Sequence, residues 1–340
     1  MRNQNPLERE LYLLRQKTPS MRYDGSEPFE AWQKTARKKL ETLLGLPKME
    51  PAELDVSIEW TKQCDTHTEI RFTFQSEPGY YVPCVLLIPN GTAAPAPVMI
   101  CLQGHSKGMH ISLGQIRYEG DQDTLSGGDR DFAIRTVKEG YCALAIEQRG
   151  FGECGGNADG PQCHIPAMAS LLTGRTAIGE RVWDVMRAID VLKEQFPQVD
   201  ADNVFCMGNS GGGTATFYAA CMDERIKIAM PSCSVCSYDV SIAPIRHCVC
   251  NFIPNIRTYF DMGDLGGLIA PRPLVMVNGA KDKIFPIDGA KETFARIQSL
   301  YAASGVPGNC SLVVGKEGHR FYADDAWPVM HRYIHSVCGK

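Results

Sequence analysis

Six short apolar runs in the later part of the chain constrain the fold more than any other sequence feature. They read PVMICLQG, YCALAIEQ, NVFCMG, KIAMPSC, PLVMVNG and CSLVVG. Strands buried on both faces have this continuous apolar character, and helix-like segments lie between several of the runs. Because strands that alternate with helices form parallel sheets, we predict an α/β fold with a doubly wound, mostly parallel sheet and helices on both faces.

The segment before these runs has a different hydrophobic pattern. From about residue 56 the stretches IEW, EIRFTF and YYVPCVLLIP alternate or run apolar, and a Glu-Pro-Gly turn at 77–79 separates the last two. This pattern is typical of antiparallel strands. Further on, residues 179–195 place apolar side chains on one side and end near Pro197, which predicts an amphipathic helix. We therefore expect the sheet to begin with antiparallel strands.

Residues 1–55 are predicted to form an N-terminal helical arm ahead of a catalytic domain at 56–340. Within the arm, residues 28–44 carry an apolar helical face, and Gly45 supplies a stop signal. This face must pack either on the main domain or on a second subunit, so it offers a surface for homo-oligomer formation.

Composition excludes several classes of partner. The chain has 340 residues, of which 44% are hydrophobic and 22% charged, and its formal net charge is −4. The sequence has no cluster of Lys and Arg like those by which proteins bind nucleic acids or membrane surfaces. The N-terminus lacks the features of a secretory signal, and no stretch approaches the ~18 apolar residues of a membrane span. We expect a cytoplasmic protein with a small-molecule partner, no nucleic acid and no membrane.

The 14 cysteines do not resemble a disulfide framework, because many lie inside apolar runs. Two pairs are candidate metal ligands: Cys233 with Cys236, and Cys248 with Cys250 next to His247. The first pair has zinc-knuckle spacing, but the second is one residue too close for the usual repeat. We expect reduced thiols lining a core or pocket, and neither a metal nor a cofactor.

The pattern G-x-S-x-G of a nucleophile elbow occurs twice, as GHSKG at 104–108 and as GNSGG at 208–212. An elbow needs a strand before the serine and a helix directly after it. The stretch GTATFYAACM after GNSGG can form a helix, whereas the stretch after GHSKG is polar and broken by glycines. Ser210 is therefore the predicted nucleophile, and Ser106 is predicted to be structural.

An acid and a base follow Ser210 in the order that a serine triad on this fold requires. Asp282 comes after the run that ends at Gly279, and His319 comes after the run that ends near Gly315. A serine hydroxyl needs an imidazole to take its proton, and a carboxylate must hold that imidazole in one tautomer. The alternatives Asp288, His331 and His335 lie on expected helix bodies, where a solvated or core role is favoured.

The GHSKG motif at 104–108 has a predicted role in the oxyanion hole. The loop after the early parallel strand is where an oxyanion hole takes one backbone N–H, and the residue after the nucleophile supplies the other. The predicted donors are the N–H groups of His105 and Gly211.

These motifs resemble the α/β-hydrolase superfamily, in particular its dienelactone hydrolase-like and acetyl xylan esterase-like branch, over about 60–340. The resemblance depends on QGH at 103–105, EQRGFGE at 147–153, GNSGG at 208–212, IAPRPLVMVNGAKDKIFP at 269–286 and GH at 318–319. It implies that Arg149 pairs with a helix carboxylate such as Asp184 as a structural bridge. Dienelactone hydrolases proper use a cysteine nucleophile, so Ser210 favours hydrolysis of acyl esters.

The predicted function is a serine carboxylic-ester hydrolase acting on short-acyl esters such as acetylated carbohydrates. The loops at 106–131, 150–176 and 247–260 are expected to border the carboxyl edge of the sheet, where ligands bind. Three alternatives stay open: a serine exopeptidase or amidase with the same triad, a catalytically silent binding module on this fold, and a zinc-dependent hydrolase that uses the cysteine pairs.

Overall fold

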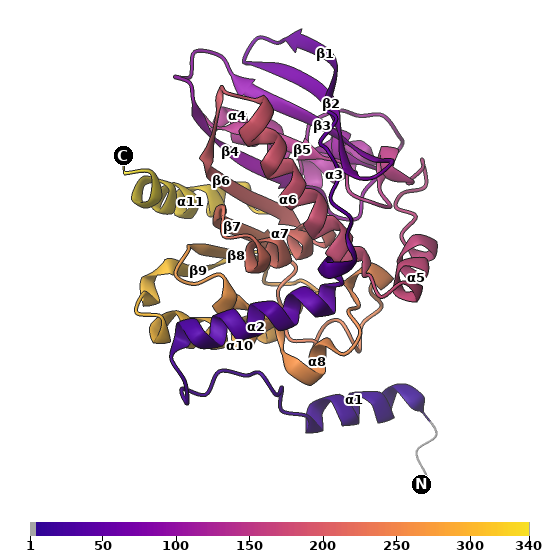
Figure 1. Cartoon of the computed structure of the whole chain (residues 1–340), viewed down its shortest axis with the longest axis vertical. Helices are drawn as coiled ribbons and strands as arrows, with labels where there is room; N and C mark the ends of the chain where they lie inside the picture. The colour runs from indigo at the N-terminus through magenta and orange to yellow at the C-terminus, as the bar shows by residue number, and fades with distance from the viewer. Residues whose placement is uncertain (1–4, 340) are drawn as a thin grey trace.

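A single mixed sheet forms the centre of the molecule in the computed structural model, which describes residues 5–339 (Figure 1). Within these residues the sheet has nine strands in the order β1-β2-β3-β5-β4-β6-β7-β8-β9. The strands are β1 Ser57–Gln63, β2 His67–Glu77, β3 Tyr80–Pro89, β4 Ala96–Leu102, β5 Cys142–Ile146, β6 Val199–Asn209, β7 Ile226–Ser232, β8 Leu274–Gly279 and β9 Cys310–Gly315.

The sheet changes direction once, at the pairing of β3 with β5. Strands β1, β2, β3 and β5 pair antiparallel, whereas β5, β4, β6, β7, β8 and β9 pair parallel. The antiparallel beginning and the parallel continuation are both as predicted. Parallel strands present their carboxyl ends at one edge of the sheet, so the loops after β4, β6, β8 and β9 meet there.

Helices join the strands and cover both faces. They are α1 Pro6–Gln16, α2 Phe29–Leu44, α3 Asp121–Gly128, α4 Phe132–Lys138, α5 His164–Leu172, α6 Ala177–Gln195, α7 Gly211–Met222, α8 Ile256–Tyr259, α9 Met262–Leu265, α10 Ile287–Ala303 and α11 Ala323–Cys338. Single 3-10 turns occur at η1 Leu46–Lys48, η2 Met109–Ile111, η3 Gly152–Cys154, η4 Val249–Asn251, η5 Gly266–Leu268 and η6 Pro307–Asn309.

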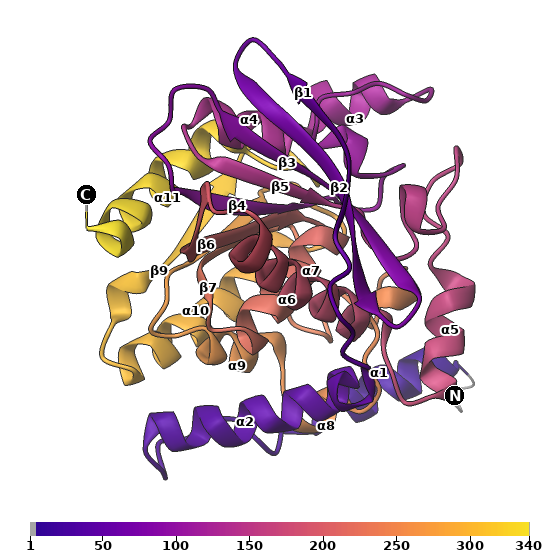
Figure 2. The same cartoon turned by 45° about the horizontal axis from the view of Figure 1, so that its top comes forward.

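The two faces of the sheet have separate cores because side chains alternate along each strand. In β4, Val98 and Ile100 point to the core under α2, α6, α7 and α10, whereas Met99 and Cys101 point to the core under α4 and α11. Figure 2 shows α6, α7 and α10 on one side of the strands and α11 and α4 toward the other. The predicted doubly wound architecture is therefore confirmed.

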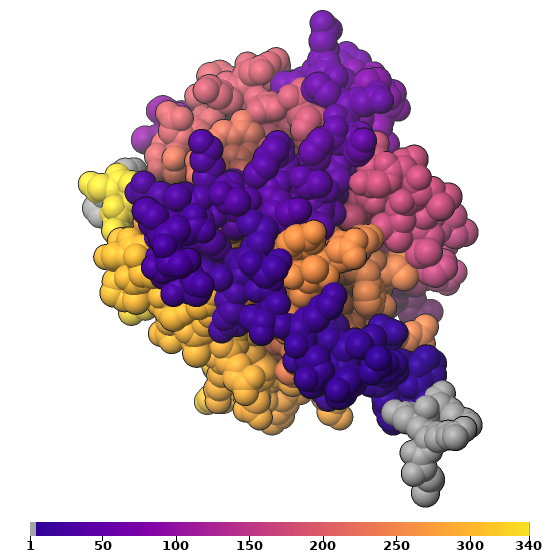
Figure 3. Space-filling view, turned by 60° about the horizontal axis from the view of Figure 1, so that its bottom comes forward, coloured from indigo at the N-terminus to yellow at the C-terminus, as the bar shows by residue number. Residues whose placement is uncertain are grey.

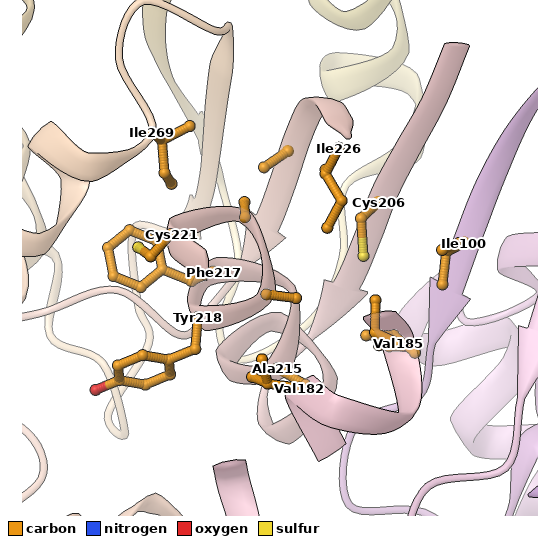
Figure 4. Packing of buried hydrophobic residues seen from close by; sticks show 14 of the residues in the cluster. Ile100, Val182, Val185, Cys206, Ala215, Phe217, Tyr218, Cys221, Ile226 and Ile269 are labelled. Carbon is orange, nitrogen blue, oxygen red and sulfur yellow. The ribbon is translucent and has the colours of Figure 1, made fainter. Parts of the chain in front are cut away.

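Helix α7 is buried along almost its whole length, which matters because it begins at the candidate nucleophile. All of its residues from Gly211 to Cys221 are buried. Ala215 and Phe217 belong to one core cluster with Val182 and Val185 of α6 and the sheet residue Cys206. In Figure 4, Ala215 lies toward Val182, whereas Phe217 lies on the other side of α7, toward Cys221 and Ile269. A helix held on all sides in this way provides a rigid support for a catalytic group at its first turn.

The N-terminal arm packs on the main body of the same chain. Helix α2 spans the predicted segment, with Gly45 as its left-handed C-cap at φ 79°. Gln33 Nε2 donates to the carbonyl oxygens of Gly267 and Ala270 at 2.6 and 2.7 Å, and Trp32 is buried in the core. Figure 3 shows the indigo N-terminal segment lying across this surface. The apolar face of α2 is thus covered within the chain, which removes the argument for self-association based on it.

Within residues 5–339, no helix has the length and hydropathy that crossing a bilayer would require.

Candidate active site

Ser210 lies at a strained turn between β6 and α7. Its backbone has φ 56° and ψ −123°, a conformation that residues other than glycine rarely adopt. The turn has no space for side chains beside it, because a Cβ at Gly212 would lie 2.1 Å from the carbonyl oxygen of Leu102. The strand, the positive-φ serine and the following helix together form the elbow geometry predicted for GNSGG.

Ser106 also follows a strand, β4, but it lacks the positive φ and the α-helix directly after the serine. The GHSKG loop is followed by the single 3-10 turn η2 at Met109–Ile111, and the hydroxyl of Ser106 is buried without a hydrogen-bond partner among the described residues. Ser106 is also absent from the lining of the cavity that contains Ser210. This geometry agrees with the structural role predicted for it.

The predicted base and acid are in contact. His319 Nδ1 lies 2.8 Å from Asp282 Oδ2. Asp282 follows β8 and His319 follows β9, both at the predicted edge of the sheet. The side chain of Asp282 is fully buried, whereas that of His319 keeps 18% of its surface exposed. The ring of His319 also stacks on Phe285 at 5.9 Å between centroids. The imidazole is therefore held from one side and open toward the cavity on the other.

Hydrogen bonds keep Asp282 ionised despite its burial. Burial by itself would raise the pKa of this carboxyl, but the contact with His319 and the N–H groups of Phe285 and Ile284 hold the pKa below its ordinary value. These N–H groups donate to Asp282 Oδ1 at 3.0 and 2.8 Å. An ionised acceptor at Nδ1 fixes the tautomer in which Nε2 can accept a proton.

A cavity of about 250 Å³ brings the predicted groups together. It is lined by His105, Arg130, Ser210, Gly211, Arg246, His247, Cys248, Asn251, Ile284, Phe285 and His319. Two of the three loops predicted to border the site, 106–131 and 247–260, contribute to this lining, whereas 150–176 does not.

The two predicted oxyanion donors are available. Gly211 is the first residue of α7, so its N–H has no acceptor inside the helix. Within residues 5–339, the N–H of His105 likewise donates no hydrogen bond to another residue. The His105 ring lies against the elbow, because a Cβ at Gly211 would be 2.7 Å from His105 Cε1. Both N–H groups belong to residues that line the cavity beside Ser210.

The alternative acid and bases lie away from this cavity. Asp288 is exposed in the first turn of α10. His331 and His335 are on α11, where His331 Nε2 pairs with Glu139 Oε2 at 2.7 Å. Their helix positions are as predicted, and none of the three lines the cavity.

A larger cavity, of about 650 Å³, lies elsewhere and contains no member of the predicted triad. It is lined in part by Tyr80, Arg149, His164 and Glu180, so the third predicted loop, 150–176, borders this hollow instead. Volume alone would favour it as the binding site, but burial raises the pKa of its Cys154 to about 12, whereas Ser210 and His319 both line the smaller cavity.

The bridge that the family resemblance implied is confirmed. Arg149 donates from Nε and Nη2 to the two carboxylate oxygens of Asp184, both at 2.8 Å, and Glu77 lies 2.8 Å from the same guanidinium. These groups join the loop after β5 to α6. They lie outside the cavity of Ser210, as a structural role requires.

Glu147, at the start of the same loop, supports the GHSKG loop from behind. Its carboxylate accepts from the N–H of Met109 at 3.1 and 3.2 Å, and burial raises its pKa to about 7. Since the folded protein keeps this proton up to a higher pH than the unfolded chain does, stability falls as pH rises from about 4.5 to about 7. The loss from this residue is on the order of 3 kcal/mol.

We therefore expect Glu147→Gln to remove this fall in stability. Urea unfolding at pH 5 and pH 8 should show a larger loss for the native protein than for the variant. Glu119→Gln, which changes an exposed residue near the same loop, is the control and should keep the native pH dependence. Equal losses in all three proteins would contradict the assignment.

The sequence places the loops of Arg130 and His247 at the site but assigns neither side chain a role there. Arg130 is buried against the elbow, its Nη2 lies 2.9 Å from the side-chain amide group of Asn209, and burial lowers its pKa to about 10. Burial, followed by the charges of His319 and His105, lowers the pKa of His247. No local spacing marks either residue, since each reaches the site only through the path of its loop.

The two cysteine pairs do not form one cluster. Cys233 lies near Asp282 and His319, whereas Cys248 and Cys250 lie near His105 and Cys163. Burial raises the pKa of Cys233 to about 12, so its thiol stays protonated beside the triad.

A parallel sheet with antiparallel first strands, a serine elbow before a buried helix, and a His-Asp pair on later loops define the α/β-hydrolase class. The matches to known proteins agree. Residues 12–164 match the Abhydrolase family, and residues 174–334 match the prolyl oligopeptidase family. The chain is 27% identical over 298 residues to YtaP of Bacillus subtilis (strain 168), named provisionally as a hydrolase; the alignment covers 83% of this chain and 92% of YtaP.

Several solved structures have a similar fold. A Bacteroides fragilis NCTC 9343 protein, named provisionally as an acetyl xylan esterase, superposes with a TM-score of 0.78 at 18% identity, covering 96% of this chain and 84% of that one. A glucuronoyl esterase from Solibacter usitatus superposes with a TM-score of 0.70 at 17% identity, covering 94% and 97%. The chain has the α/β-hydrolase fold and resembles the acetyl xylan esterase-like branch of that superfamily.

Proposed function

We propose that the protein is a serine hydrolase of carboxylic esters that acts on short-acyl esters such as acetylated carbohydrates. The observation that carries this proposal is the His319–Asp282 hydrogen bond at the same cavity as Ser210. A base held by an ionised acid and a nucleophile at a helix N-terminus are the parts that acyl transfer needs.

In the proposed reaction, His319 Nε2 takes the proton of Ser210 while Oγ attacks the ester carbonyl carbon. The N–H groups of His105 and Gly211 donate to the oxygen that becomes negative. The tetrahedral intermediate breaks its bond to the alcohol oxygen, which receives the proton from His319, and an acyl-enzyme remains. Water, deprotonated by His319, then releases the acid and restores Ser210.

The size and lining of the cavity support a short acyl group. Its volume of about 250 Å³ is at the small end for ligand sites, and Ile284 and Phe285 supply an apolar wall. Arg130, Arg246 and Asn251 bring hydrogen-bond donors to the same cavity. Donors of this kind suit the hydroxyl and ether oxygens of a carbohydrate better than a long lipid chain.

Amide hydrolysis is the second candidate, because the C-terminal half of the chain, 174–334, matches the prolyl oligopeptidase family. The same triad can cleave amides, since the base that activates Ser210 can also protonate an amine leaving group.

A substrate panel tests these candidates. We expect 4-nitrophenyl acetate to be hydrolysed with a kcat/KM at least about tenfold above that of the octanoate ester, and acetate to be released from acetylated xylo-oligosaccharides. The matched acetyl 4-nitroanilide should react far more slowly. Preference for the anilide would support the amidase. Folded protein that turns over no ester and forms no fluorophosphonate adduct would indicate a binding module.

A further inference from the structure

Four potential metal ligands converge beside the candidate oxyanion loop. They are His105, Cys163, Cys248 and Cys250, and their ligand atoms all lie within 4.8 Å of one another. His105 follows β4, Cys163 is the N-cap of α5, and the other two belong to the η4 region. Cys250 Sγ lies 3.3 Å from His105 Nε2, and the three cysteines form no disulfide. Three separate parts of the chain thus place soft ligands at one point.

The spacing suits a tetrahedral ion. Zinc binds cysteine sulfur at about 2.3 Å and histidine nitrogen at about 2.0 Å, so ligand atoms around it lie about 3.3 to 3.8 Å apart. The four side chains therefore need only small movements to reach such an arrangement, and three thiolates with one imidazole are a usual ligand set for structural zinc. Cys163 and Cys250 are buried, and His105 and Cys248 are half-buried.

A buried positive charge nearby lacks a carboxylate partner. Arg181 is buried, its Nη2 lies 3.3 Å from Cys163 Sγ, and its guanidinium packs on Phe151 at 4.5 Å from the ring centroid. Its Nε and Nη2 donate to the backbone carbonyl oxygen of Arg149 at 3.2 and 2.7 Å, and its Nη1 has no hydrogen-bond partner. Within residues 5–339, Arg181 forms no ion pair with an acidic side chain. A buried charge without a counter-charge is costly, so the sulfur cluster has to supply the negative charge.

We propose that His105, Cys163, Cys248 and Cys250 bind one Zn²⁺ ion in a closed structural site. On binding, the three thiols release their protons to solvent, and neutral His105 donates its Nε2 lone pair without any change of redox state. The product, one Zn²⁺ with three thiolates, carries a charge of −1, which Arg181 balances. Protein atoms fill all four positions, so no water or substrate binds the ion. This site is independent of the ester-hydrolase proposal and replaces the expectation of no metal.

The site has a consequence for the oxyanion loop. The His105 ring already lies against Gly211 at the elbow. Coordination at Nε2 would fix this ring, and with it the backbone whose N–H is the candidate oxyanion donor. The ion would tie the loop after β4 to α5 and to the η4 region, which also contributes Cys248 and Asn251 to the cavity.

Metal analysis of the purified, tag-free protein tests the proposal. We expect one zinc per chain by mass spectrometry of the metal content. After chelation under reducing conditions, added Co²⁺ should give the thiolate charge-transfer and visible bands of tetrahedral Co²⁺ bound to sulfur. Cys163→Ser and Cys250→Ser should weaken zinc binding by at least about tenfold to a hundredfold. Cys310→Ser changes a buried cysteine outside the cluster and should keep the native zinc content.

Other results would overturn it. Reduced native protein that shows no charge-transfer band with Co²⁺ has no such site, and this measurement does not depend on whether the cysteine variants fold. An intact mass two hydrogens lower, with a disulfide mapped among the three cysteines, would assign the cluster to redox chemistry. Ser210→Ala should keep its zinc, so loss of the esterase proposal would leave this one standing.

Discussion

Replacing Ser210 with alanine should lower kcat for ester hydrolysis by about 10⁴-fold to 10⁶-fold. Without the hydroxyl no acyl-enzyme can form, and the remaining turnover comes from binding and the oxyanion donors. The fold should be unaffected, because alanine has the same Cβ as serine at the strained φ of 56°. Stopped assays at saturating ester measure kcat for both proteins, and thermal melts measure whether their stabilities are equal.

Ser106→Ala is the matched control, since Ser106 satisfies the same sequence pattern. It should retain most of the activity. Peptide mapping after fluorophosphonate treatment should place a single adduct on Ser210 in the native protein. An inactive Ser106→Ala protein beside an active Ser210→Ala protein would show that the elbow has been assigned to the wrong serine.

Asp282→Asn should reduce kcat by about 10⁴-fold. The amide cannot carry the negative charge that His319 Nδ1–H faces at 2.8 Å, so the imidazole loses both its orientation and the stabilisation of its protonated form. Because hydrogen bonds hold the pKa of Asp282 below its ordinary value, the native protein keeps this carboxylate charged throughout the neutral range. The rate loss in the variant should therefore persist from about pH 5 to pH 8.

The lowered pKa of Asp282 also determines how this residue affects the stability of the fold in acid. Asp282 binds a proton less readily in the folded protein than in the unfolded chain, so its contribution is present above the ordinary carboxyl range and is lost as pH falls through the lowered value. Asp288→Asn changes an exposed aspartate six residues later and serves as the control, with activity expected near the native value. Native activity in Asp282→Asn would exclude this residue as the acid.

Local pattern was sufficient for most of the architecture. The continuous apolar runs became buried strands, and α2 ended at the predicted Gly45 because only glycine adopts a left-handed cap without strain. Helix α6 began at Ala177, slightly before the predicted residue 179, since Thr176 caps it through the N–H of Gly179. Helix α1 was not predicted, although Asn5 and Pro6 are start signals that could have indicated it.

The candidate triad was predictable for a different reason. Each of its residues lies within a few positions of the end of a parallel strand, and parallel strands bring their carboxyl ends to one edge of the sheet. The sequence predicts that the loops 106–131 and 247–260 border the site, but it does not predict which of their side chains enter the cavity. Arg130 and His247 reach the cavity only through the paths of their loops, and no spacing in the sequence encodes those paths.

The sequence was enough to predict the sheet, several of its helices and the strand ends that carry the candidate triad, because these depend on hydrophobic periodicity and on short turns. Tertiary packing decided where the N-terminal arm docks, which cavity contains Ser210 and His319, and which cysteines lie together. Cys163 joins Cys248, Cys250 and His105 although it is distant from all three along the chain. Contacts between distant segments follow from how whole layers pack, and a local pattern contains no information about that packing.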